Sequence, residues 1–172
     1  ASGAYENASL PVIAGDSYEL SFMYNNAAIT ATTTVPDKPT NFACTPLTLT
    51  IPTFGGGTGG PPTLPEPLKA TWDNPNGNYH LLAIKSVDAG ATEISTFGGG
   101  QGPGFTNTPD QADNKEINFR AFTYYGRNAL ILYRIQPELA VLYNSGGSNS
   151  QNLTTVPSNV SNGLGIFTAV NI

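Results

Sequence analysis

The sequence predicts an all-β protein, and three observations carry this prediction. Apolar and polar side chains alternate with a period of two over several stretches, as they do in strands that bury one face. The chain has 172 residues, of which 19 are glycine and 14 are proline, and these residues separate the alternating stretches. No stretch has the extended periodicity of a long amphipathic helix.

The first predicted element is a hairpin. Residues 17–25 place aromatic and aliphatic side chains on one face and mostly polar side chains on the other. Asn25 and Asn26 follow as a turn, and residues 29–35 are β-branched at almost every position, which suits a pleated strand. We therefore expect these two stretches to pair.

Pro36 and Pro39 mark the predicted boundary between two structural units. Proline cannot donate to a strand ladder, and it stiffens a connection. The sequence is therefore expected to contain a partial or small β unit over residues 1–36, as the end of a first sandwich, and a second β unit over residues 37–172. A missing strand in the first unit would leave an edge that can pair with a partner strand.

The second unit is predicted to hold several strands and two long loops. The strands are residues 47–51, 68–73, 79–87, 116–125, 129–135 and 165–170, and the loops are residues 53–67 and 89–114. Pro75 and Gly77 stand at turn positions, so we expect a hairpin between the second and third of these strands. The fourth and fifth strands are expected to pair around Gly126, with the fifth central in its sheet and buried on both faces.

A single helical turn is predicted over residues 137–143. Pro137 at the first position and Glu138 in the first turn suit a helix N-terminus. Strands and turns at this spacing are typical of an immunoglobulin-like or fibronectin type III-like β-sandwich. The sequence therefore predicts an all-β sandwich of this kind with one short helical turn.

One local repeat occurs in the two long loops, where residues 53–57 and 96–100 both read TFGGG. One interpretation is a pair of matching loops that present their backbone to a ligand. The interpretation we favour is two tolerant surface loops at one end of the sandwich, because loop composition changes easily. Neither copy is a phosphate loop, since no Lys-Ser or Lys-Thr follows the glycines.

Charge and composition exclude several function classes. The formal net charge is −5, and the seven basic residues are scattered along the chain. We therefore expect no binding to nucleic acid and no basic patch for a lipid surface. Only 11% of the residues are charged, and Asn, Thr, Ser and Gln supply the polarity, which is typical of an extracellular β protein. No apolar run approaches the length of a transmembrane segment.

The residues that could carry catalysis are few. The chain has one histidine, His80, in an alternating strand, which predicts a partly buried or rim side chain rather than a catalytic base. Its one cysteine, Cys44, is expected to be a buried thiol at a strand start, and the two residues cannot form a zinc site. Trp72 shares a face with Leu68 and Ala70 and is expected in the core rather than on a sugar-stacking surface. The sequence predicts no catalytic, cofactor-binding or metal-binding residue and no cofactor, so we expect the protein not to be an enzyme.

The acidic residues leave two alternatives open. Glycoside hydrolysis needs two carboxylates that converge in a cleft, and acids such as Asp73 and Asp88 lie in loops or at strand ends. Asp110, Asp113 and Glu116 lie close together before a predicted strand, where their oxygens would suit calcium. In both cases the interpretation we favour is a set of solvated carboxylates in loops.

Several segments of the chain resemble one known family. They are residues 16–20 with 32–36, 71–75, 78–80, 132–138 and 158–168. The last two, which read LYRIQPE and SNVSNGLGIFT, are the most specific. Together these segments are similar to sandwich units of a group of uncharacterised Bacteroidota envelope lipoproteins, a domain of unknown function.

The resemblance implies lipid-anchored proteins with tandem β-sandwich units that are suspected of serving outer-membrane transporters. Proteins of this family begin with a signal peptide and an anchoring cysteine, so the lipid anchor is expected in a longer precursor. The resemblance brings no catalytic residues with it. We therefore expect an exported protein of the bacterial cell envelope, associated with the outer membrane or the cell surface.

Three classes of function follow from these observations. The leading hypothesis is a non-enzymatic binding or structural module that acts through protein–protein contacts, either as an accessory to an outer-membrane transporter or by self-association. The alternative is a glycan- or nutrient-binding accessory protein, which would need exposed aromatic residues beside Asn, Asp or Gln. The third class, an enzyme, would need two converging carboxylates.

Overall fold

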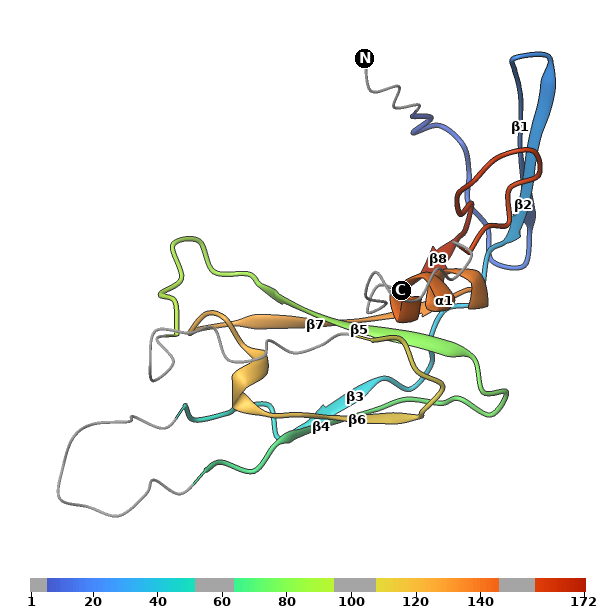
Figure 1. Cartoon of the computed structure of the whole chain (residues 1–172). Helices are drawn as coiled ribbons and strands as arrows, with labels where there is room; N and C mark the ends of the chain where they lie inside the picture. The colour runs from blue at the N-terminus through green and yellow to red at the C-terminus, as the bar shows by residue number, and fades with distance from the viewer. Residues whose placement is uncertain (1–5, 52–63, 95–107, 146–156) are drawn as a thin grey trace, which may run out of the picture.

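The computed structural model describes residues 6–51, 64–94, 108–145 and 157–172, and it is mostly β (Figure 1). Its strands are β1 (Ser17–Tyr24), β2 (Ala27–Thr34), β3 (Ala43–Thr45), β4 (Leu68–Thr71), β5 (Tyr79–Ser86), β6 (Asn114–Ile117), β7 (Asn128–Ile135) and β8 (Val170–Asn171). A 3₁₀ turn, η1 (Phe119–Ala121), and one helix, α1 (Pro137–Ser145), complete these elements. The all-β prediction with one short helix is therefore confirmed.

The predicted hairpin is β1 paired with β2 in antiparallel register, with Tyr24 opposite Ala27. Asn25 and Asn26 form the two-residue turn, and their φ angles are 47° and 62°. Two consecutive positive φ angles define a type I′ turn, which matches the twist of the flanking strands. Asparagine tolerates this conformation better than most residues, so the Asn-Asn pair explains the turn type.

Two three-stranded sheets form a sandwich-like body. One sheet has the order β3–β4–β6 and the other has the order β5–β7–β8. Figure 1 shows the two sheets lying over one another. The cluster between them consists of Leu68, Ala70, Trp72, Leu82, Ile117 and Leu132, and these residues come from both sheets. Burying their side chains on both sides of one interface is what holds the layers together.

The connection over residues 74–78 does not close a hairpin, contrary to the prediction. Strand β4 pairs with β3 and β6, whereas β5 pairs with β7, so the connection passes from one sheet to the other. Turn chemistry at Pro75 and Gly77 is equally compatible with this path. Leu68 and Leu82 both bury their side chains in the layer between the sheets, which requires β4 and β5 to lie on opposite sides of it.

Other boundaries also differ from the prediction. Residues 47–51 form no strand, because β3 ends at Thr45 and Pro46 has no N–H to continue a ladder. The predicted strand 116–125 stops at Ile117 and turns into η1, so it does not pair with β7 around Gly126. Of the predicted strand 165–170, only its last residue is in β8. The two TFGGG segments lie outside the described residues.

Strand β7 is central in its sheet, as predicted, but most of its side chains are half-buried rather than fully buried. Helix α1 packs against the outer face of β7, which explains why β7 carries apolar side chains on that face as well. Ala140 of the helix has no exposed surface and packs in a cluster with Leu81 and Ile135, on the face away from Trp72. The helix therefore covers one end of this sheet.

The hairpin is attached to the sandwich by residues that are distant in the sequence. Thr30 and Ser161 exchange two backbone hydrogen bonds, of 3.4 and 2.8 Å. The Asn162 side chain donates to the Ala28 carbonyl at 2.9 Å, and the Asn171 side chain donates to the Pro36 carbonyl at 3.0 Å. These bonds fix one side of the hairpin, along β2.

No helix among the described residues is both long enough and apolar enough to cross a lipid bilayer.

We expect Ile117→Ala to lower the free energy of unfolding by about 2–5 kcal/mol, because Ile117 is fully buried between the sheets and its removal leaves a cavity. Val12→Ala is the matched control, since Val12 is 63% exposed and its truncation opens no cavity. Urea unfolding of both variants checks this. Equal midpoints for the two variants would contradict the sandwich-like core described above.

Candidate functional site

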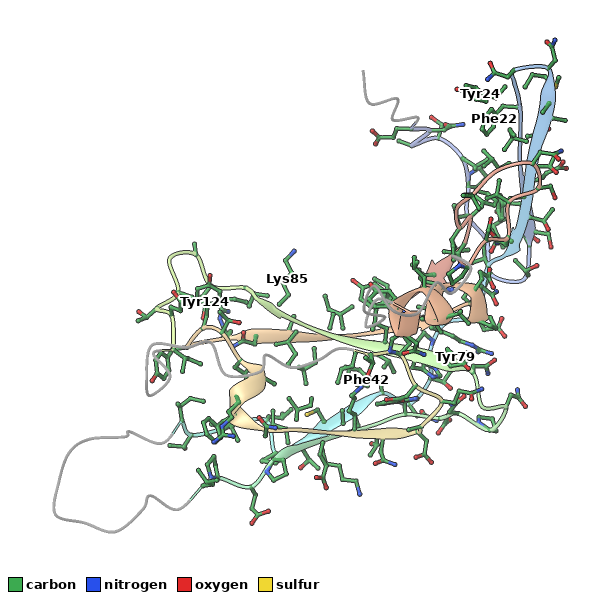
Figure 2. The ribbon with its side chains drawn as sticks, in the orientation of Figure 1. Phe22, Tyr24, Phe42, Tyr79, Lys85 and Tyr124 are labelled. Carbon is green, nitrogen blue, oxygen red and sulfur yellow. The ribbon has the colours of Figure 1, made fainter. Side chains whose placement is uncertain are left out.

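Two features of the described residues can bind another molecule: a cavity at one end of the sandwich and the outer edge of the hairpin. The cavity has a volume of about 410 Å³. Its walls come from residues 42–51, the start of β4, Ile94, residues 122–126 and the start of β7. Figure 2 labels two of the lining residues: Phe42, just before β3, and Tyr124, at the end of the sandwich away from the hairpin.

One wall of the cavity is held by a short backbone pairing. The Ile94 N–H donates to the Thr123 carbonyl at 2.8 Å, and the Tyr125 N–H donates to the Thr92 carbonyl at 2.9 Å. The Asn128 side chain donates to the carbonyl of Gly126 at 3.1 Å. These bonds set the backbone of the wall before any ligand is present.

An ion pair fixes the same wall from outside. The Asp88 carboxylate accepts a hydrogen bond from the Arg127 N–H at 2.6 Å and a second from Arg127 Nε at 2.8 Å. Hydrogen bonds from the Arg127 backbone and side chain lower the pKa of Asp88. The carboxylate also lies against Gly126, whose φ of 96° and lack of a Cβ permit this approach.

The side chains that line the cavity are apolar or uncharged. The polar side chains in the lining are those of Tyr124 and Tyr125, which are 40% and 44% exposed, and of Asn128. Cys44 also lines the cavity and is half-buried, rather than fully buried as predicted, and burial raises the pKa of its thiol. The arrangement offers hydrocarbon contact and a few neutral hydrogen-bonding groups.

The second feature is the outer edge of β1. The residues that flank a two-residue turn form a hydrogen-bonded pair, so Tyr24 faces Ala27 through its backbone groups, and every second residue of β1 does the same. The N–H and C=O groups of Glu19, Ser21 and Met23 therefore point away from β2. Among the described residues they have no hydrogen-bond partner, whereas the equivalent groups of Thr30 on β2 bond Ser161.

The hairpin also has an apolar face that is only partly covered. Tyr18, Leu20, Phe22 and Tyr24 share this face, because alternate residues of a strand point the same way. Phe22 and Tyr24 are 48% and 64% exposed, and Figure 2 labels both near the tip of the hairpin. A groove of about 500 Å³ runs between this face and residues 160–167.

His80 and Trp72 are buried neighbours. His80 is 3% exposed, Trp72 is 5% exposed, and their ring centroids are 5.6 Å apart. The core position predicted for Trp72 is confirmed. Burial lowers the pKa of His80, and the charge of Arg134 acts in the same direction, while the Asn78 carbonyl and Asp110 act against them.

The acidic residues that suggested calcium are engaged elsewhere or lie apart. Asp110 forms an ion pair with Lys115 at 3.1 Å, and the Asp113 carboxylate accepts a hydrogen bond from Asn114 at 2.6 Å. Glu116 lies on β6 opposite Lys69. Within the described parts of the chain, no three His, Cys, Asp or Glu side chains lie close enough together to hold a metal ion.

The sequence raised an unpaired strand edge in the first unit but did not assign it to β1, and it gave no sign of the cavity. The Asn-Asn turn carried the information for the edge, because a type I′ turn fixes which backbone groups of β1 face outward. The cavity depends on contacts between distant segments that no local pattern reveals. Comparison with known proteins adds no assignment, since no family model, curated protein or solved structure matches the chain.

We expect the stability of the protein to fall as the pH is lowered from 7.5 to 5.5, in part through His80. Its folded-state pKa lies below the ordinary value of 6.5, so the unfolded chain binds more protons in this range. The contribution of His80 is thus fully present above pH 6.5 and is lost below it. His80→Phe, which cannot titrate, should show a flatter dependence of the unfolding free energy on pH. Parallel curves for the two proteins would show that His80 titrates normally in the folded state.

Proposed function

We propose that this chain is a non-enzymatic binding and structural module of the bacterial cell envelope that acts through protein–protein contacts. The observation that carries the proposal is the open edge of β1, with its apolar face beside it. The resemblance to envelope lipoproteins and the low content of charged residues, 11%, support the location. Attachment through a lipid in a longer precursor remains part of the same proposal.

We further propose that residues 37–172 form an immunoglobulin-like or fibronectin-like sandwich. The order β3–β4–β6 places the first, second and fourth strands of the unit in one sheet. The order β5–β7–β8 places the third, fifth and sixth in the other. This is the arrangement of strands A, B, E and C, F, G in immunoglobulin-type sandwiches. Such a scaffold would hold the hairpin rigidly at one end.

The partner that the edge of β1 fits is an extended strand, because alternating N–H and C=O groups are satisfied by backbone pairing. A second copy of this chain supplies such a strand. With the two β1 strands antiparallel and Ser21 opposite Ser21 of the second copy, Leu20 lies opposite Phe22 of that copy. In the same register Tyr18 lies opposite Tyr24 of that copy, so the four apolar side chains of each β1 all find apolar partners.

Charge favours the same register. Glu19 then lies opposite Met23 of the second copy rather than opposite another Glu19, so no like charges face each other. The result is a four-stranded sheet, β2–β1–β1–β2, with one continuous apolar face. A closed two-fold contact of this kind leaves no open β1 edge on either copy.

We expect the purified protein to form a dimer, which Ser21→Pro dissociates. Proline removes the outward N–H of Ser21, which β2 does not use, so the hairpin itself keeps its bonds. Thr32→Pro is the matched control, because it removes an outward N–H from the other edge of the same hairpin. Light scattering coupled to size-exclusion chromatography, over a range of concentrations, checks the mass of each.

A cysteine cross-link tests the register. In a Cys44→Ser background, Ser21→Cys should form a disulfide-linked dimer under mild oxidation, because residues paired across antiparallel strands lie within disulfide reach. Thr32→Cys, exposed on the same polar face but on β2, should not. A protein that stays monomeric at all concentrations, with no cross-link through Ser21→Cys, would overturn pairing with a second copy. Binding of a different protein that Ser21→Pro abolishes would show that the edge accepts a foreign strand instead.

A further inference from the structure

We infer that the cavity beside β3 is a binding site for a small, uncharged, mainly hydrocarbon molecule that carries one or two hydroxyl or carbonyl groups. This inference is independent of the pairing of β1, because the cavity lies at the other end of the sandwich from the hairpin (Figure 2). Its volume of about 410 Å³ falls within the range of roughly 300–1,000 Å³ that is usual for small-molecule sites.

The chemistry of the lining defines the ligand class. None of the described side chains that line the cavity is charged, so an ionic ligand would lose its hydration without gaining a counter-charge from them. Phe42, Leu49 and Leu130 present hydrocarbon, and the polar groups of Tyr124, Tyr125 and Asn128 are few. A sugar, which needs many hydrogen-bonding partners, fits this lining less well than a molecule with an apolar body and a single polar end.

The cavity is lined by segments that lie far apart in the sequence. An isoleucine stands two positions before each TFGGG copy, as Ile51 and Ile94, although the residue between differs (Pro52 and Ser95). Ile51 follows β3 and Ile94 follows β5, yet both line the same cavity. Two segments that are distant in the sequence therefore each supply an isoleucine to this cavity.

The wall is also preformed. The pairing of residues 92–94 with 123–125 and the ion pair of Asp88 with Arg127 hold the β7 side in place from outside the cavity. A site that is organised before binding avoids the cost of ordering its walls around the ligand. This is the property expected of a binding site rather than of a gap in packing.

Cys44 offers a direct reporter of occupancy. It is the one cysteine in the chain, it lines the cavity, and it is half-buried. We would measure its rate of alkylation by N-ethylmaleimide in the wild-type protein, alone and with N-phenyl-1-naphthylamine, a neutral apolar fluorophore. The matched probe is 8-anilinonaphthalene-1-sulfonate, which differs by an added sulfonate. The neutral probe should fluoresce on binding and slow alkylation at least tenfold, and the anionic probe should do neither.

Two variants test whether the neutral probe binds in the cavity. Cys44→Phe fills the cavity and should weaken binding of the neutral probe at least tenfold, whereas Val141→Phe, at an exposed position on α1, should leave it unchanged. The alkylation experiment uses the wild-type protein, so it decides the question even if Cys44→Phe fails to fold. Fluorescence without protection of Cys44 would mean that the probe binds elsewhere, and would overturn the inference. Equal binding of both probes, or no binding, would overturn it as well.

Discussion

The packing of β4 against β5 around Trp72 is the contact on which the rest of the structure depends. Trp72 fills the layer between the two sheets and stacks near His80, which lies on the facing strand. The side chains in this layer set the spacing of the two sheets, and a gap between the sheets can open only where this layer ends. The cavity beside β3 lies where the apolar filling of the layer ends, so the core and the candidate site are two parts of one interface.

The hairpin depends on the same sandwich in a different way. A two-stranded hairpin is at best marginally stable alone, so β1 and β2 need a third element. Ser161 and Asn162 supply it along β2, and the Gln136 side chain, at the start of α1, donates to the Thr34 carbonyl. All of these bonds lie on one side. Among the described residues, the asymmetry leaves the outward backbone groups of β1 without hydrogen-bond partners, which is the state that proteins usually cover or blunt.

Local patterns predicted the strands better than their partners. The alternation in β1 and the Pro137 start of α1 were sufficient, because each reflects a choice made within a few residues. The pairing around Gly126 was wrong because turn residues specify a reversal of the chain but not the sheet that it joins. The half-buried position of Cys44 could not be predicted either, since the cavity that exposes it is formed by segments on both sides of the sandwich. Ile51 and Ile94 show the same limit, because nothing in the local sequence indicates that both residues line one cavity.

The hydrogen bond from Asn162 to Ala28 spans 134 residues of sequence. During synthesis or export, which proceed from the N-terminus, β1 and β2 therefore emerge long before the segment that completes them. Until residues 158–162 follow, both edges of the hairpin are unprotected and its apolar face has no cover. The hairpin therefore cannot complete its hydrogen bonds until nearly the whole chain has been synthesised. A stalled or truncated chain would therefore present an aggregation-prone hairpin.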